Sequence, residues 1–247
     1  MLYLLRMALV GLNFLLTGFI GLFVGLARPF NPDNNRLFGR MYSHPALRIL
    51  GLKLRAEVGP LLDHPPGCVI IANHQSNWDL FLLGTVVPPR MACIGKKSLK
   101  WVPLFGQLFW LGGNVLINRQ NAYQARRSLQ TTSRVLAEQN TSIWIFPEGT
   151  RNPGSTLLAF KKGAFQMAIE AGVPIVPLCV SRYAGRLNFN RWRSGELRVR
   201  SLPPIPTRGL TAKDVPELMA RCREQMQHCI DDLSREAPQN SPAPVRS

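Results

Sequence analysis

The pattern of hydrophobic and polar positions divides the chain into a long apolar start and a series of short apolar runs. Residues 7–27 contain no charged side chain. As a helix, such a run is long enough to cross the roughly 30 Å hydrocarbon core of a bilayer. Residues 35–50 follow with three arginines set among apolar positions, which predicts a helix on an anionic surface. We therefore expect residues 1–52 to form membrane-associating helices.

A cleaved secretory signal is the alternative interpretation of residues 7–27. The run is longer than the ~7–15 apolar residues of such signals, and no disulfide pattern follows it. More Lys and Arg flank its C-terminal side than its N-terminal side, which predicts that the C-terminal side faces the cytoplasm. The expected location is the inner (cytoplasmic) membrane. Whether the run spans the bilayer or returns within one leaflet stays open at this stage.

After residue 52 the pattern changes to short strands that alternate with helices. Residues 68–72, 143–146 and 175–180 are apolar and rich in β-branched side chains, as buried strands are. Helical spacing of apolar positions predicts helices at 121–139 and around 165–169. This order indicates an α/β domain over residues 53–236, with a mixed, largely parallel central sheet flanked by helices.

The last predicted element is a helix that begins at Asp214. Its apolar stripe predicts packing against the domain, and the Pro- and Ser-containing tail, residues 237–247, is expected to be disordered. The stripe consists of Val215, Leu218, Met219, Cys222, Met226, Ile230 and Leu233.

The strongest chemical signal is a histidine followed five positions later by an aspartate, His74 and Asp79. On a regular helix this spacing leaves the side chains about 140° apart, and on a strand it sends them to opposite faces. The two can meet only in an irregular segment. Residues 68–72 predict a strand before the pair, and Ser76 and Asn77 are suitable N-caps for a helix after it. We therefore expect His74 on a strand-to-helix loop, as a base oriented by Asp79.

A second signal is the Phe-Pro-Glu-Gly-Thr-Arg segment at residues 146–151. Gly149 lets backbone N–H groups approach an anion, and Arg151 offers a bidentate guanidinium. Glu148 repels phosphate, so we expect it to hold an arginine or a hydroxyl group. A general base and an anion site in one chain suggest an enzyme that acts on a phosphorylated molecule.

Two further blocks complete an ordered set of four. The first spans residues 95–119, with Gly-Lys-Lys-Ser-Leu at 95–99 and Gly-Asn-Val-Leu-Ile-Asn-Arg at 113–119, and the second is Val-Pro-Ile-Val-Pro at 173–177. Together with the two signals above, these blocks closely resemble the 1-acyl-sn-glycerol-3-phosphate acyltransferase family over residues 50–204. The apolar N-terminus resembles the bacterial membrane-bound members.

The resemblance implies a specific reaction. A fatty acyl group passes from an acyl thioester, acyl-CoA or acyl carrier protein, to the sn-2 hydroxyl of lysophosphatidic acid, and phosphatidic acid forms. His74 would deprotonate that hydroxyl, which attacks the thioester directly without an enzyme nucleophile; Ser76 lacks the context of a nucleophile elbow. No cofactor or metal is implied. The residues that the resemblance assigns to the acceptor phosphate and glycerol are Lys97, Arg119, Glu148, Gly149, Thr150 and Arg151.

Charge and cysteine content fit this interpretation. The net charge of +16 attracts anionic lipid, a phosphorylated substrate, an acidic carrier or nucleic acid, and the apolar N-terminus argues against nucleic acid. The five cysteines show no zinc spacing and are expected to be reduced core thiols.

Several alternatives stay open from the sequence. The same chemistry could act on another lysolipid, such as a lyso-ornithine lipid or a lysophospholipid, and a non-catalytic membrane-binding protein would also explain the charge. The apolar residues 101–110 could be core, membrane contact or an acyl-chain groove. The basic residues 186–193 could bind headgroups or an acidic carrier, or be a solvated loop.

Overall fold

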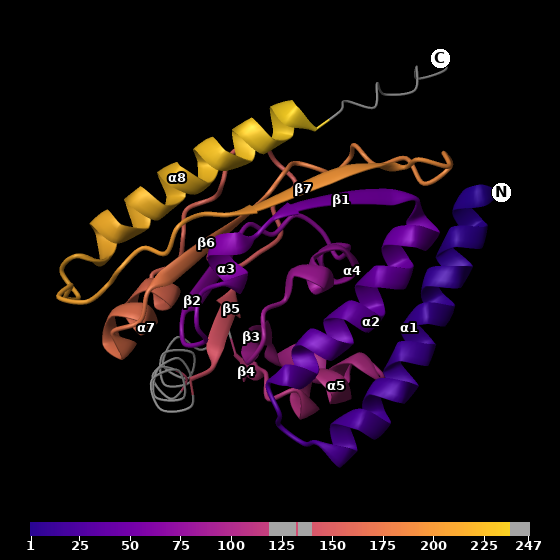
Figure 1. The fold of residues 1–247 in the computed structure, drawn as a ribbon, viewed down its shortest axis with the longest axis horizontal. Coiled ribbons are helices and arrows are strands. Elements are labelled where there is room, and N and C mark those ends of the chain that lie inside the picture. Colours follow the sequence, from indigo (N-terminus) through magenta and orange to yellow (C-terminus); the bar gives the residue numbers. More distant parts are fainter. Residues whose placement is uncertain (119–131, 133–139, 238–247) are drawn as a thin grey trace.

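The architecture is a sheet with helices on both faces, seen in a computed structural model that describes residues 1–118, 132 and 140–237 (Figure 1). Arg119, the expected helix at 121–139 apart from Thr132, and the tail after Ala237 lie outside the described residues. Seven strands pair in the order β1-β7-β6-β2-β5-β3-β4 within the described chain. Their bounds are β1 Leu52–Glu57, β2 Val69–Ala72, β3 Met91–Lys96, β4 Val115–Ile117, β5 Ser142–Ile145, β6 Ile175–Val180 and β7 Gly195–Ser201.

The sheet is mixed and largely parallel, as the sequence predicts. β2 pairs in parallel with β5 and β6, and β3 pairs in parallel with β4 and β5. β6 and β7 are antiparallel, while β1 runs parallel to β7. The carboxyl ends of β2, β3, β4, β5 and β6 therefore meet at one edge of the sheet, where α/β proteins bind their ligands.

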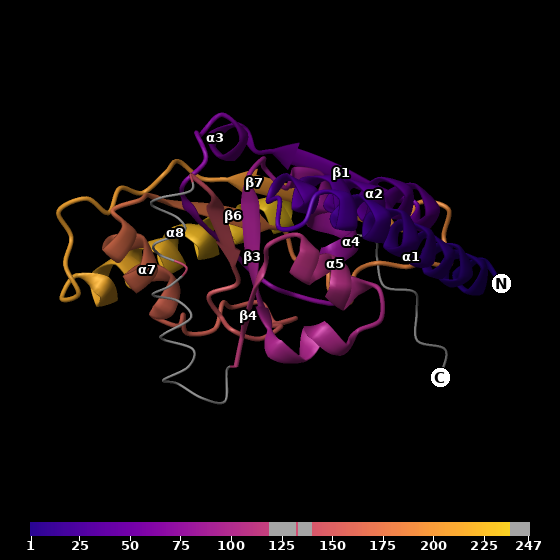
Figure 2. The same cartoon turned by 90° about the horizontal axis from the view of Figure 1, so that it is seen from below.

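Alternate residues of the central strands face two different helical layers. Val69 and Ile71 of β2 belong to the core that includes helices α7 (Gly163–Ala171) and α8 (Val215–Glu236). Ile70 and Ala72 belong to the core on the other face, with helices α2 (Asp33–Leu50) and α4 (Asp79–Leu83). This two-residue alternation is the ordinary consequence of strand geometry. Figure 2 shows α7 and α8 separated from α1 and α2 by the sheet.

The N-terminal helix α1 (Leu2–Ala27) packs on α2 and on α5 (Phe105–Leu111). The side of α1 that meets the protein carries small and polar residues, while its outer side exposes large apolar ones. In the described residues, α1 is the one helix whose length and composition would allow it to cross a membrane. The exposed apolar side chains are Leu4, Leu5, Leu9, Leu12, Leu15, Leu16, Phe19, Ile20, Phe23 and Leu26.

Helix α2 differs from the interfacial helix that the sequence suggests. Phe38, Tyr42 and Leu50 are buried, and the helix lies between α1 and α4. Most of its apolar positions are therefore occupied by protein contacts rather than by lipid. The exposed stripe is narrow and holds Leu37, Arg40, His44 and Arg48.

The predicted strands at 68–72, 143–146 and 175–180 are confirmed as β2, β5 and β6, and the helices near 165 and after Asp214 as α7 and α8. Gly172 ends α7 in the left-handed conformation, with φ of 65°. The expected N-cap at Ser76 or Asn77 is wrong. Helix α4 begins at Asp79 after Trp78, and the Ser76 hydroxyl accepts the Trp78 N–H within the loop instead (3.2 Å).

The remaining described elements are short: α3 Gly59–Leu62 and the 3-10 helices η1 Gly84–Val86 and η2 Lys97–Trp101. Residues 101–110 thus form the end of η2, a turn and most of α5. Leu108 is buried, whereas Trp101 and Trp110 are exposed.

Candidate active site

The predicted meeting of His74 and Asp79 is present in the loop between β2 and α4. His74 Nδ1 lies 2.5 Å from Asp79 Oδ2. The backbone N–H groups of Gln75 and Ser76 donate to the same oxygen, at 2.9 and 3.3 Å. The loop therefore folds around the carboxylate, which brings together two residues that a regular helix or strand would keep apart.

This contact fixes what the other ring nitrogen of His74 can do. An ionised carboxylate only accepts hydrogen bonds, so Nδ1 carries the proton, and Nε2 of the neutral ring keeps a free lone pair. The His74 side chain is 24% exposed, while that of Asp79 is 4% exposed. The ring stacks on Phe146 with centroids 4.1 Å apart. This arrangement suits a base whose direction is fixed on one side and whose reactive nitrogen can be reached.

A tyrosine that the sequence analysis missed completes the surroundings of Asp79. The Tyr183 hydroxyl donates to Asp79 Oδ1 from the segment after β6. Burial, together with the charge of Asp79 and its hydrogen bond, raises the pKa of Tyr183, so the phenol stays protonated. The two residues are 104 positions apart, and only the parallel pairing of β2 with β6 brings them together.

Two amides join the His74 loop to the end of β6. The Asn73 side chain donates to the Val180 carbonyl at 3.0 Å and accepts the Val180 N–H at 2.8 Å. The Gln75 side chain donates to the Ser181 carbonyl at 2.9 Å and accepts the Tyr183 N–H at 3.0 Å. Because these groups are buried and paired, the loop has little freedom to move.

The turn after β5 lies directly against the same loop. Glu148 is buried, and its carboxylate accepts the N–H of His74 (3.4 Å), the Asn152 side-chain N–H (2.7 Å) and the Leu158 N–H (3.0 Å). Asn152 in turn donates its backbone N–H to the His74 carbonyl, at 2.7 Å. In the described residues Glu148 therefore holds the turn together. It does not bond to an arginine there, which was one of the two roles expected from the sequence.

Three predicted anion-binding residues of this turn follow Glu148. Gly149 adopts φ of +72°, which favours glycine, and its N–H donates to the Phe146 carbonyl. Thr150 is exposed. Arg151 is also exposed, and its guanidinium donates to the Asn77 side chain at 2.5 Å, which places it over the His74 loop. An exposed cation next to the base can hold an anionic group of a substrate.

Lys97 and Arg119 follow the neighbouring strands. Lys97 is exposed at the first residue of η2, directly after β3. Lys96 of β3 pairs with Ile117, the last residue of β4, and Arg119 lies outside the described residues. The topology brings Lys97 to the edge that carries His74 and Arg151, although no direct bond between Lys97 and these residues occurs in the described part of the chain.

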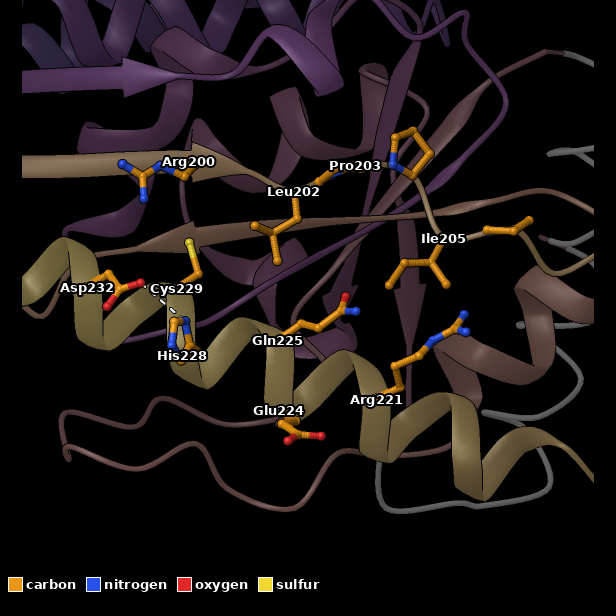
Figure 3. A pocket seen from close by; sticks show the side chains of 12 residues that line it. Arg200, Leu202, Pro203, Ile205, Arg221, Glu224, Gln225, His228, Cys229 and Asp232 are labelled. Atoms are coloured by element: carbon orange, nitrogen blue, oxygen red, sulfur yellow. Dashed lines mark ion pairs between the residues drawn. The ribbon is translucent and has the colours of Figure 1, made fainter.

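A large cavity lies elsewhere. It measures about 650 Å³ between α8 and the chain that follows β7, and Figure 3 shows Arg200, Arg221, Glu224 and Asp232 around it. Both signs of charge line it, and Arg200 is paired with Glu57. Its lining contains none of the predicted site residues.

No group of three or more His, Cys, Asp or Glu suited to a metal occurs among the described residues. The five cysteines are free thiols, and four of them are buried. Burial raises the pKa of Cys93 and of Cys222 to about 12, which leaves these two thiols protonated and unreactive at neutral pH.

Comparison with known proteins identifies the class. A family model described as Acyltransferase matches residues 60–181, the segment that holds the His74 loop and the turn after β5. The 1-acyl-sn-glycerol-3-phosphate acyltransferase of Salmonella typhimurium is 39% identical over 236 residues, 96% of each chain. The Escherichia coli protein of the same name is 39% identical over 98% of this chain and 99% of its own. The human alpha protein is 35% identical over 94% of this chain and 82% of its own.

The chain is therefore an acyltransferase, and it belongs to the 1-acyl-sn-glycerol-3-phosphate acyltransferase family. The solved 1-acyl-sn-glycerophosphate acyltransferase of Thermotoga maritima has the same fold, with a TM-score of 0.73 and 22% identity over 94% of each chain.

Proposed function

We propose that this acyltransferase transfers a fatty acyl group from an acyl thioester to the sn-2 hydroxyl of 1-acyl-sn-glycerol 3-phosphate, forming phosphatidic acid for phospholipid synthesis. The names of its relatives support this substrate. The observation that carries the chemistry is the 2.5 Å contact between His74 Nδ1 and Asp79, which leaves Nε2 as the basic nitrogen.

The proposed reaction needs no covalent enzyme intermediate. His74 Nε2 takes the hydroxyl proton while the hydroxyl oxygen attacks the thioester carbonyl carbon. The tetrahedral intermediate then expels the thiolate, which takes the proton back from the imidazolium, so the products are an ester and a free thiol. Asp79 stabilises the imidazolium without becoming protonated, as in hydrolase triads. The donor, acyl-CoA or acyl carrier protein, enters as a substrate, and we propose no cofactor or metal.

The acceptor phosphate is proposed to bind at the cationic side of the same edge. Arg151 is supported by its position over the His74 loop, and Lys97 by its place directly after β3. Arg119 is proposed from the resemblance alone. Thr150 and Gly149 belong to the same turn and would contact the phosphate or glycerol, whereas Glu148 would keep the turn in shape.

We further propose that α1 lies within one leaflet and that the catalytic domain stays on the cytoplasmic side. The contacts of α1 with the rest of the protein extend from the Tyr3 N–H, bonded to Asn190, through Asn13, bonded to the Tyr42 carbonyl, to Gly25, packed on Leu111. A helix attached along its whole length cannot cross the bilayer unless the domain enters too. Its exposed apolar side would instead sink into the acyl boundary of the membrane.

Purified full-length protein in neutral detergent tests the activity. It would be given lysophosphatidic acid with acyl-CoA or with acyl carrier protein, and phosphatidic acid would be measured. A lysophospholipid with a phosphodiester and a lyso-ornithine lipid are the comparison acceptors. We expect strong preference for the phosphate monoester, because only that group carries close to two charges for the arginines. Equal turnover of the ornithine lipid would contradict the proposed acceptor.

A further inference from the structure

The segment between Tyr183 and β7 forms an ordered basic loop beside the start of α1. This arginine loop, residues 184–194, contains three arginines and no acidic residue. Internal bonds hold its shape, among them Asn188 N–H to the Ser194 carbonyl at 3.0 Å and Arg191 N–H to the Asn188 carbonyl at 3.1 Å. Its order indicates a built surface rather than a solvated connection.

One side of the arginine loop is fixed to α1. Arg6 is buried, and its guanidinium donates to the carbonyls of Phe189, Arg191 and Trp192 at 2.6–3.0 Å and to the Ser194 hydroxyl at 2.6 Å. Both views place the loop beside the N-terminus (Figures 1 and 2). Leu4 and Leu5, which precede Arg6 directly in the chain, belong to the exposed apolar side of α1. The loop is therefore continuous with the surface that we propose faces lipid.

A second side of the arginine loop packs beside the His74 loop, and its third side is exposed. The Phe189 ring lies 5.1 Å from the ring of Trp78, the residue before Asp79. Arg186, Arg191 and Arg193 are exposed, and Trp192 is 82% exposed. An exposed tryptophan among arginines whose side chains have no partner in the described part of the chain suits the boundary between headgroups and acyl chains, where the ring and the cations each find a partner.

We propose that the arginine loop binds anionic headgroups of the bilayer surface and so holds the opening of the site against the membrane. The proposal rests on the proposed membrane location of α1. An acidic carrier protein would also match the charge, but contact with α1 and the exposed Trp192 favour lipid.

The test removes the three positive charges of the arginine loop and compares the result with the removal of three positive charges elsewhere on the surface. The loop variant is Arg186→Gln/Arg191→Gln/Arg193→Gln, and the control is Arg208→Gln/Lys213→Gln/Arg221→Gln, all three exposed. Residues 202–214 lie at the end of the molecule opposite the N-terminus in both views. Partition of full-length protein from sub-solubilising detergent into phosphatidylcholine vesicles, with and without phosphatidylglycerol, gives the anionic preference of each protein.

Each arginine near an anionic surface contributes roughly fivefold, so the loop variant should lose about a hundredfold of the preference at low salt. The control should lose much less, and high salt should remove the difference. A second measurement uses tryptophan fluorescence. The fluorescence lost on Trp192→Phe should match the part of the parent protein's emission that brominated phosphatidylglycerol quenches. Thermal unfolding checks that all variants fold.

An unchanged anionic preference in the loop variant, or a Trp192 that brominated lipid does not quench, would overturn the proposal. A raised KM for acyl carrier protein with unchanged vesicle binding would assign the loop to the carrier instead. Failure of the parent protein to acylate lysophosphatidic acid would refute the proposed acceptor without changing the partition result.

The contact between Tyr183 and Asp79 supports a second inference, independent of the arginine loop. The structure assigns to Tyr183 the role of a positioning residue that acts through this carboxylate, because its hydroxyl is the donor on Oδ1 while Oδ2 serves His74. Without that donor, the carboxylate charge is less dispersed and holds the imidazolium more strongly. The other charged groups near the pair in the described residues are Glu148 and Arg151, and no hydrogen bond joins either of them to Tyr183 there.

Tyr183→Phe tests this role, with Tyr42→Phe as the control. Tyr42 is also buried, and its hydroxyl has no hydrogen-bond partner within the described structure. We expect Tyr183→Phe to lower kcat about tenfold or more, to change the acceptor KM little, and to move the acid limb of the pH–rate profile to higher pH. Tyr42→Phe should leave both kcat and the profile unchanged. If Tyr183→Phe and Tyr42→Phe have the same pH–rate profile, Tyr183 contributes only packing and not the positioning of Asp79.

Discussion

At the residue scale, the site is built on the carboxylate of Asp79. Its two oxygens accept from His74 Nδ1, from the N–H groups of Gln75 and Ser76, and from the Tyr183 hydroxyl. A buried charge is tolerated only when it is hydrogen-bonded in this way. Donors on both oxygens hold the carboxylate in one orientation, and this orientation sets the direction of the imidazole.

Replacing the base should slow the chemical step severely without unfolding the protein. His74→Ala should lower kcat by about 10²–10⁴, the usual contribution of a general base. Asp79→Asn should also be strongly impaired, because the amide no longer enforces a proton on Nδ1. Steady-state rates with both substrates, together with thermal unfolding, check this. Near-normal turnover of folded His74→Ala would exclude the proposed mechanism.

Arg151 should act on the acceptor and not on the donor. A charged hydrogen bond contributes about 1.5–3 kcal/mol, so Arg151→Ala should reduce kcat/KM for lysophosphatidic acid by roughly 10–150-fold. Lysine should restore only part, because an ammonium cannot make the bidentate contact. Kinetics with each substrate varied in turn, beside an exposed control Arg208→Ala, separate the two sites. A raised donor KM with an unchanged acceptor KM would assign Arg151 to the donor.

The sequence revealed some of these residues and not others, for a physical reason. His74 and Asp79 are five positions apart, and the strand before them and the helix after them made an irregular loop the natural solution. Tyr183 is 104 positions from Asp79 and reaches it only through the pairing of β2 with β6. A buried tyrosine in a short loop has no local pattern that would distinguish it from a core residue.

At the element scale, a row of glycines lets α1 approach α5. A Cβ on Gly21 would lie 2.5 Å from Leu108 Cδ2, and one on Gly18 would lie 2.8 Å from Leu104. Gly25 meets Leu111 in the same way. Their spacing of three and four residues puts them on one side of the helix, so the backbone of α1 packs directly on leucines of α5 and of the turn before it.

Gly21→Leu should therefore destabilise the protein, whereas Gly11→Leu should not. A Cβ on Gly11 meets nothing within 4 Å, and both changes add the same apolar side chain to the same helix. Overpacking at Gly21 should cost about 1–3 kcal/mol, which corresponds to an unfolding midpoint about 3–10 °C lower. Thermal unfolding in one detergent measures both. Equal midpoints for the two variants would show that α1 does not pack on α5 as described.

Elements with strong local patterns were the predictable ones. β2, β5 and β6 are continuous apolar runs, and α8 carries a long stripe. The two strands on the β1 side of the sheet, β1 and β7, were missed because half of their side chains are charged. Arg200 bonds to Glu57 at 2.7 Å and Arg55 to Glu196 at 2.9 Å. The Arg200 hydrogen bond lowers the pKa of Glu57, so this edge is held by ion pairs that a hydropathy pattern does not reveal.

At the scale of the whole molecule, the net charge of +16 and the apolar start could be read from the sequence, but the position of α1 relative to the domain could not. The deciding contacts join Arg6 to a loop more than 180 positions away. Hydropathy measures whether a helix can enter lipid. It does not measure whether the rest of the protein is attached along one side of that helix.

Labelling from each side of the membrane decides how α1 lies. Tyr3→Cys and Arg28→Cys place a thiol at an exposed position at each end of α1, while the native cysteines are buried or half-buried. If α1 lies in one leaflet, a membrane-impermeant maleimide should label both variants in inverted membrane vesicles and neither in intact spheroplasts. The parent protein measures background labelling. If α1 spans the bilayer, its two ends must instead be labelled from opposite sides, and the domain would have to part from most of the helix. That result would also remove the arginine loop from the start of α1, because Arg6 could no longer hold its carbonyls.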